Sequence, residues 1–94
     1  MDEHQKTYRA VIRGRVQGVF FRVAIKKKAE QLDIEGEARN KSEGSVEVLF
    51  SAPTPHAYQA FVTFLHNGPE LARVNSVNVE PADHQEFDGF AIVD

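Results

Sequence analysis

The chain has 94 residues and no cysteine, with 41% hydrophobic and 27% charged residues. This size predicts one domain with one hydrophobic core, and the composition excludes a large multidomain enzyme, a disordered chain, a disulfide scaffold and thiol chemistry. The net charge of −3 hides a division, because residues 1–28 hold eight Lys and Arg against two acidic residues, whereas residues 29–94 hold three against twelve. We therefore expect the first third to meet an anion, either small or a nucleic acid.

The first predicted elements are a strand and a helix. Apolar and charged residues alternate from Thr7 to Arg13, which predicts a half-buried strand ending at Gly14. After a loop over residues 14–20, an amphipathic helix is expected from Phe21 to Leu32. Its apolar stripe consists of Phe21, Ile25, Ala29 and Leu32.

A hairpin and a second helix come next. Two short alternating stretches, Glu37–Arg39 and Ser45–Phe50, flank a turn that contains Gly44, which is typical of a hairpin. Thr54 suits the N-cap and Pro55 the first position of a helix, which Asn67–Gly68–Pro69 should end.

The last part of the chain should add two strands. The spacing of Val74, Val77 and Val79 predicts a strand with a bulge, and Phe90 and Ile92 mark a short final one. The order β-α-β-β-α-β, plus a C-terminal β, predicts the α+β ferredoxin-like split βαβ sandwich, an antiparallel sheet with two helices on one face. This scaffold hosts enzymes, RNA binders, metal chaperones and ligand sensors, so function must be argued from the site.

The loop before the first helix is the candidate site. Backbone N–H groups and the positive end of a helix dipole meet there, Gly14 and Gly18 allow tight turns, and Arg22 offers a planar fork of donors. No Gly-Lys-Ser/Thr follows, and no acidic residue lies nearby to hold Mg²⁺, so a nucleoside-triphosphate loop is excluded. The residues alone leave two readings, phosphate or carboxylate binding and a plain strand-to-helix turn.

The same residues resemble a known family. Gly14–Arg22, with the sequence GRVQGVFFR, closely resembles the acylphosphatase signature Gly-x-Val-Gln-Gly-Val-x-Phe-Arg. Asn40–Glu47 is similar to that family's second motif, Asn-x-x-Asp-Gly-x-Val-Glu, with Glu43 in place of Asp, and Gly68–Pro69 with Ala72–Val74 resembles a weaker third stretch. The resemblance extends over residues 7–93. Asp33 departs from it, because the family tends to have Gly there, and this changes the capping of the first helix.

The resemblance implies a single acylphosphatase domain, with residues 1–6 expected to form a flexible tail. The implied activity is metal-independent hydrolysis of acyl phosphates to a carboxylate and inorganic phosphate, which is both product and inhibitor. It also implies that Arg22 binds the phosphate, that Asn40 orients the attacking water, and that a set of backbone amides cradles the phosphoryl oxygens. These amides belong to Arg15, Val16, Gln17, Gly18, Val19 and Phe20.

Such a site needs few catalytic groups. The leaving carboxylate has a conjugate acid with a pKa of about 4 and departs without a general acid. Phosphoryl transfer then requires mainly positioning and charge stabilisation. We expect no cofactor and no metal, because the four histidines lack a ligand spacing, and we give the Lys26–Lys28 run no catalytic role. The histidines are His4, His56, His66 and His84.

Two other functions remain open at this point. An acylphosphatase-like module could keep the anion cradle and serve only to bind phosphate or carbamoyl phosphate. A ferredoxin-like RNA binder is disfavoured, because the predicted central strands offer Arg9, Arg13, Ser45 and Glu47 where exposed aromatic pairs would be needed. The polar N-terminus and the lack of a long apolar run predict a cytoplasmic protein. We expect a monomer that acts on a small-molecule acyl phosphate and binds neither nucleic acid nor membrane.

Overall fold

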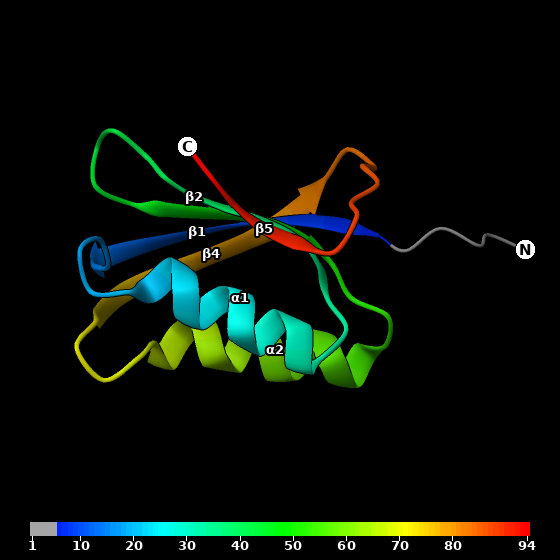
Figure 1. Ribbon diagram of the computed structural model, residues 1–94, viewed down its shortest axis with the longest axis horizontal. Helices are drawn as coiled ribbons and strands as arrows, with labels where there is room; N and C mark the ends of the chain where they lie inside the picture. Colours follow the sequence, from blue (N-terminus) through cyan, green and yellow to red (C-terminus); the bar gives the residue numbers. More distant parts are fainter. Residues whose placement is uncertain (1–5) are drawn as a thin grey trace, which may run out of the picture.

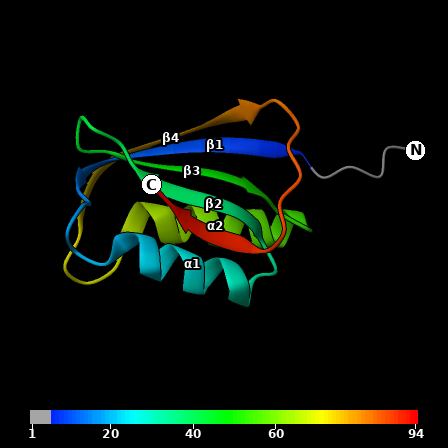
Figure 2. The same cartoon turned by 45° about the horizontal axis from the view of Figure 1, so that its top comes forward.

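The computed structural model describes residues 6–94, so the expected tail lies, apart from Lys6, outside the described residues. Within that range, two helices pack on one face of a five-stranded sheet (Figure 1 and Figure 2). The helices are α1 (Phe21–Gln31) and α2 (Pro55–Asn67). The strands are β1 (Thr7–Arg15), β2 (Glu35–Asn40), β3 (Val46–Ser51), β4 (Arg73–Ala82) and β5 (Phe90–Val93). The predicted order of elements is confirmed.

The strands lie in the order β4-β1-β3-β2-β5. The first four pair antiparallel, as expected for a split βαβ arrangement. The C-terminal strand β5 instead pairs parallel with β2, with Gly36 opposite Phe90 and Ala38 opposite Ile92. The sheet is therefore mixed at this one edge, which refines the expectation of an antiparallel sheet.

Strand β1 continues one residue beyond its predicted end at Gly14, to Arg15. Gly14 and Arg15 stay in register with Val74 and Arg73, because β4 absorbs an extra residue, Asn75, as a bulge. Gly14 has φ 136°, and a Cβ there would collide with the carbonyl oxygen of Arg73. Close packing of β1 against β4, and not a turn, is what requires glycine at this position.

The helix ends follow recognisable capping chemistry. Thr54 Oγ1 accepts a hydrogen bond of 3.0 Å from the Ala57 N–H, which confirms the predicted N-cap of α2. Helix α1 ends in a Schellman pattern, in which the Ile34 N–H donates to the carbonyl of Ala29 at 2.8 Å. The residue that turns left-handed in this motif is Asp33, with φ 57°.

The hydrophobic core lies between the sheet and the helices. It contains the predicted stripe of α1 at Phe21, Ile25 and Ala29, whereas Leu32 is only partly buried. A row of aromatic rings continues through it: Tyr8 contacts Phe50, Phe50 contacts Phe61, and Phe61 contacts Phe90, with centroids 4.8–6.3 Å apart. Phe90 thereby ties the edge strand β5 to helix α2.

The other face of the sheet carries charges. Glu47 lies among three cations, with nitrogen-to-oxygen distances of 3.1 Å to Arg9, 3.8 Å to Arg39 and 4.0 Å to Lys41. Ser45, expected on this face, is instead buried, immediately before β3. No helix in residues 6–94 is long and apolar enough to cross a membrane.

Candidate active site

Two segments that are distant in the sequence meet at one end of the sheet. Figure 1 shows the connection between β1 and α1 beside the turn between β2 and β3. The first segment contains residues 16–20 of the phosphate loop, which is predicted over residues 15–20, and the second follows Asn40 at the end of β2. The topology therefore brings the two sequence motifs together, because β1 and β2 both pair with β3.

The backbone of the loop is turned by two left-handed residues. Gly18 has φ 74°, and Phe20, which precedes α1, has φ 60° and ψ 27°. The N–H groups of residues 17–20 have no backbone hydrogen-bond acceptor among the described residues, and no side chain caps the N-terminus of α1. Several donors and the positive end of a helix dipole are thus available to an anion.

Gln17 fixes this loop to the hairpin turn. Its side-chain Nε2 donates to the carbonyl oxygens of Lys41 at 2.8 Å and Ser45 at 2.9 Å. The same turn is closed by the Lys41 N–H, which donates to the carbonyl of Ser45 at 2.8 Å. The relative position of the loop and Asn40 is therefore set by directed hydrogen bonds between the two segments.

A cavity of about 350 Å³ opens between these segments. Predicted site residues from both motifs line it, namely Val16, Gly18, Phe20, Arg22 and Asn40. Phe21, Val23 and Ile92 complete the lining. Arg22 is the one charged side chain among these residues, and the lining contains no carboxylate. A cavity with this lining favours an anion next to an apolar group.

The side chains of Arg22 and Asn40 are both available for a ligand. The carbonyl oxygen Oδ1 of Asn40 is buried and has no hydrogen-bond partner among the described residues. Arg22 forms no ion pair with any residue in the range 6–94. Buried polar atoms are normally satisfied, so an unpaired acceptor in a cavity indicates a place where a donor, such as water, binds.

Three of the predicted cradle residues lie outside the cavity lining. Arg15 belongs to β1, opposite Arg73. The side chain of Gln17 is engaged with the hairpin turn, and Val19 packs against the core. For all three residues the predicted contribution is a backbone amide, and the identity of the side chains that line the cavity does not test it.

Val23 and Ile92 line the cavity but are absent from the predicted site residues. Val23 breaks the expected pattern of α1, because it falls outside the apolar stripe. Ile92 follows the expected alternation with Phe90 but is exposed, whereas Phe90 is buried. An apolar residue on a polar helix face is the signal that could have revealed Val23, whereas no sequence pattern distinguishes Ile92 from a core residue.

Glu43 stabilises the hairpin turn electrostatically. The Ser45 hydroxyl donates to its carboxylate at 2.8 Å, and this bond, a backbone hydrogen bond and the nearby Lys41 and Arg13 lower the pKa of Glu43 below its usual value of 4.5. Gln17 of the phosphate loop binds the carbonyl of Ser45, so the Glu43 carboxylate holds the same residue to which the loop is bound.

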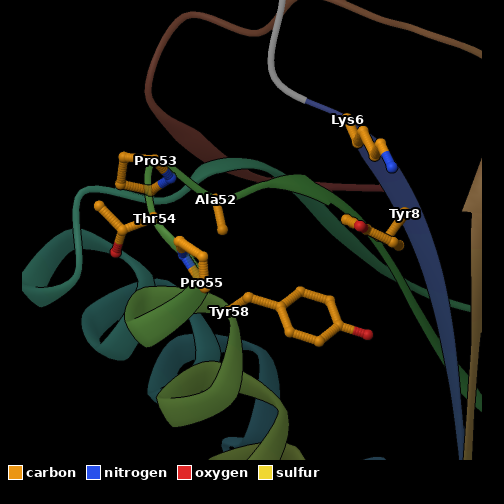
Figure 3. Close-up of a pocket in the computed structure, with 7 residues that line it drawn as sticks. All are labelled: Lys6, Tyr8, Ala52, Pro53, Thr54, Pro55 and Tyr58. Atoms are coloured by element: carbon orange, nitrogen blue, oxygen red, sulfur yellow. The ribbon is translucent and has the colours of Figure 1, made fainter.

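A second cavity, of about 370 Å³, contains none of the predicted site residues. Figure 3 shows its lining, which comes from the start of β1 and from the segment that leads into α2. The rings of Tyr8 and Tyr58 lie 4.8 Å apart there, and burial, with Tyr8 as a second cause, raises the pKa of Tyr58.

Residues 6–94 hold no group of three or more His, Asp or Glu placed to bind a metal ion.

Comparison with known proteins gives a consistent result. Residues 8–92 match the family model described as Acylphosphatase. The chain is 47% identical over 83 residues to an acylphosphatase of Halorhodospira halophila, covering 88% of this chain and 89% of the relative. It superposes on an acylphosphatase structure from Coxiella burnetii with a TM-score of 0.89 and 31% identity, covering 97% of this chain and 95% of the other. A full-length HypF structure in the phosphate- and nucleotide-bound form also matches, with a TM-score of 0.83 and 26% identity, over 95% of this chain but 12% of that one.

Proposed function

This chain belongs to the acylphosphatase family, and we propose that its phosphate loop, Arg22 and Asn40 carry out the family's reaction. The activity is hydrolysis of acyl phosphates. The observation that carries the residue assignment is the shared cavity of Arg22 and Asn40, in which the Oδ1 of Asn40 has no partner among the described residues.

Arg22 and the loop N–H groups bind the phosphoryl group. The guanidinium donates two parallel hydrogen bonds to phosphoryl oxygens, and the amides of the residue 15–20 loop, chiefly the unpaired ones of residues 17–20, donate to the remaining oxygens. These donors stabilise the charge that is spread over three equatorial oxygens in the transition state. Inorganic phosphate, the product, fits the same donors and therefore inhibits.

Asn40 positions the nucleophile. Its Oδ1 accepts a hydrogen bond from a water molecule, which holds the water oxygen in line with the bond to be broken. The water oxygen attacks phosphorus, and the bond from phosphorus to the acyl oxygen breaks with its electron pair going to the carboxylate. The water proton passes to a phosphoryl oxygen. No metal ion takes part in this proposal, and the carboxylate leaves without a general acid.

Cleavage of benzoyl phosphate by purified protein tests this proposal. We expect rapid hydrolysis that EDTA leaves unchanged, that inorganic phosphate inhibits competitively, and that Arg22→Ala abolishes. Reaction in H₂¹⁸O, followed by ³¹P NMR, should put the label into phosphate, because water attacks phosphorus. Label in benzoate instead would contradict the proposed attack. Arg9→Ala, on the uncovered face of the sheet, is the matched control for loss of an arginine.

The match to HypF favours one alternative, a module that binds phosphate or carbamoyl phosphate without turnover, because there the similar region forms 12% of a larger protein. Phosphate binding without benzoyl phosphate hydrolysis by folded protein would support the module.

The expectations of a single domain, a monomer and a cytoplasmic location stay predictions from the sequence. Size-exclusion chromatography with light scattering tests the monomer.

A further inference from the structure

Exposed apolar side chains gather around the cavity of Arg22 and Asn40. Four large hydrophobic residues are exposed within residues 6–94, and three of them line this cavity. Phe20 is 76% exposed, Val23 52% and Ile92 38%, whereas the fourth, Leu71, lies elsewhere. Single exposed apolar residues need no explanation, but a cluster beside a polar site indicates a ligand with an apolar part.

The three side chains come from separate parts of the chain. Phe20 ends the phosphate loop, Val23 lies in the first turn of α1, and Ile92 lies on β5, opposite Ala38 in the parallel pair with β2. All three line the same cavity as Arg22 and Asn40. Arg22 directly precedes Val23, and Asn40 ends β2, the strand with which β5 pairs.

The backbone at Phe20 is unfavourable for the residue it carries. A bulky side chain with φ 60° is strained, and 76% exposure returns little burial energy to offset the strain. Such a combination is expected where an aromatic side chain serves a ligand rather than the fold.

We propose that Phe20, Val23 and Ile92 form the subsite for the acyl group, and that the substrates are acyl phosphates with an uncharged, apolar acyl group, aromatic or branched. This inference rests on the proposed function and names its substrate class. The lining contains no carboxylate, and its single cation, Arg22, is assigned to the phosphate. An acyl group that carries an amine, a carboxylate or a second phosphate would thus lose its hydration without gaining a partner.

The test compares kcat/KM for benzoyl, acetyl and succinyl phosphate. Wild-type protein should prefer benzoyl phosphate, and Val23→Ser with Ile92→Ser should lower the ratio of benzoyl to acetyl phosphate roughly tenfold, the effect of about 1.4 kcal/mol of lost apolar contact. The intrinsic reactivity of each acyl phosphate cancels when the ratios of wild type and variant are compared. Phe20 is left unchanged because its N–H belongs to the phosphate loop.

Two kinds of control separate this effect from misfolding. Leu71→Ser removes an apolar side chain that is 68% exposed but lies outside the cavity, and should leave the ratio unchanged. The conservative pair Val23→Ile and Ile92→Leu should keep the wild-type ratio. Ile92→Lys should raise the ratio of succinyl to benzoyl phosphate about tenfold, a gain that a damaged protein cannot produce.

The outcomes distinguish the two proposals. If wild-type protein cleaves none of the three compounds, the proposed function is wrong. If it cleaves all three and neither the serine pair nor Ile92→Lys changes the ratios, the acyl subsite is wrong while the proposed function stands.

Discussion

Gln17 and Ser45 are joined by a hydrogen bond of 2.9 Å from the side-chain Nε2 to the main-chain oxygen, across 28 positions of the chain. A second bond from the same nitrogen reaches the carbonyl of Lys41 at 2.8 Å. Because Asn40 directly precedes Lys41, these bonds set the distance between the phosphate loop and the residue proposed to hold the water. Several effects of substitution follow from this arrangement.

Gln17→Ala should lower both activity and stability. The carbonyl oxygens of Lys41 and Ser45 each lose one of two donors, because backbone N–H groups still bind both of them. The loss of two hydrogen bonds should cost about 1–3 kcal/mol of the free energy of unfolding. The loop also loses its position relative to Asn40, and we expect kcat/KM to fall about tenfold or more. Urea denaturation and benzoyl phosphate kinetics measure the two effects. Gln17→Glu should be worse than alanine, since a carboxylate would face two carbonyl oxygens, and equal activity of both variants with wild type would contradict the positioning role.

Arg22→Lys keeps the positive charge but removes the planar fork of donors. We expect kcat/KM to fall by about 10²- to 10³-fold and phosphate inhibition to weaken, with little change in the free energy of unfolding. Arg22 is partly exposed and has no ion pair within residues 6–94, so the fold does not depend on it. Steady-state kinetics and calorimetry with phosphate measure these quantities. Wild-type kinetics would remove Arg22 from the site.

Asn40→Ala should separate turnover from binding. The water loses its partner, so kcat should fall about 10²- to 10³-fold while the dissociation constant of phosphate stays within about a factor of two. Removing a buried acceptor without a partner should leave the free energy of unfolding unchanged or raise it. A loss of phosphate binding equal to the loss of turnover would show that Asn40 is a structural residue of the turn.

Asp33→Gly should stabilise the protein. Asp33 holds φ 57° at the end of α1, where glycine avoids the steric cost and an aspartate charge opposes the helix dipole. We expect a gain of about 1 kcal/mol and a Tm about 4–8 °C higher, although the greater freedom of glycine in the unfolded chain offsets part of it. Asp33→Asn removes only the charge, so a glycine variant no more stable than the asparagine variant would contradict the backbone explanation.

Glu43 should make stability depend on pH in the acidic range. Its pKa is lowered in the folded state, so the carboxylate stabilises the fold above its unfolded value, near 4.5, and this contribution is lost as pH falls through the folded pKa. Glu43→Gln should therefore be less stable than wild type at pH 7, and the difference should shrink as the pH falls below 4.5 and disappear below the folded pKa. Ser45→Ala, which removes the hydroxyl donor, should reduce the same difference. A difference in stability that does not shrink as the pH falls below 4.5 would contradict this assignment.

Much of the fold follows from local patterns. The alternation from Thr7, the stripe of α1 and the cap at Thr54 each depend on residues close together in the chain, and the structure confirms them. The spacing of Val74 and Val77 even indicates the bulge, since three positions separate residues that alternation would place two or four apart.

Other features arise only from tertiary structure. The side chain of Gln17 donates to two backbone carbonyl oxygens. Every residue has such an oxygen, so no sequence pattern predicts which ones Gln17 binds. The parallel pairing of β5 with β2 and the arrival of Ile92 at the cavity depend on the path of residues 83–89 across the end of the sheet. The family motifs predict roles for Arg22 and Asn40, but they say nothing about the apolar residues that line the same cavity.

The interior position of β1, between β3 and β4, has a consequence for the order of events during synthesis. The residues of the phosphate loop are synthesised early. The hairpin that anchors the loop and the strands that flank β1 are synthesised later, and Ile92 later still. A growing chain that already holds Arg22 and Asn40 therefore has no assembled site, since its contacts are of long range. In refolding experiments, catalytic activity should therefore return more slowly than helical structure forms. The rate at which activity returns then measures the last step, in which the sheet is completed.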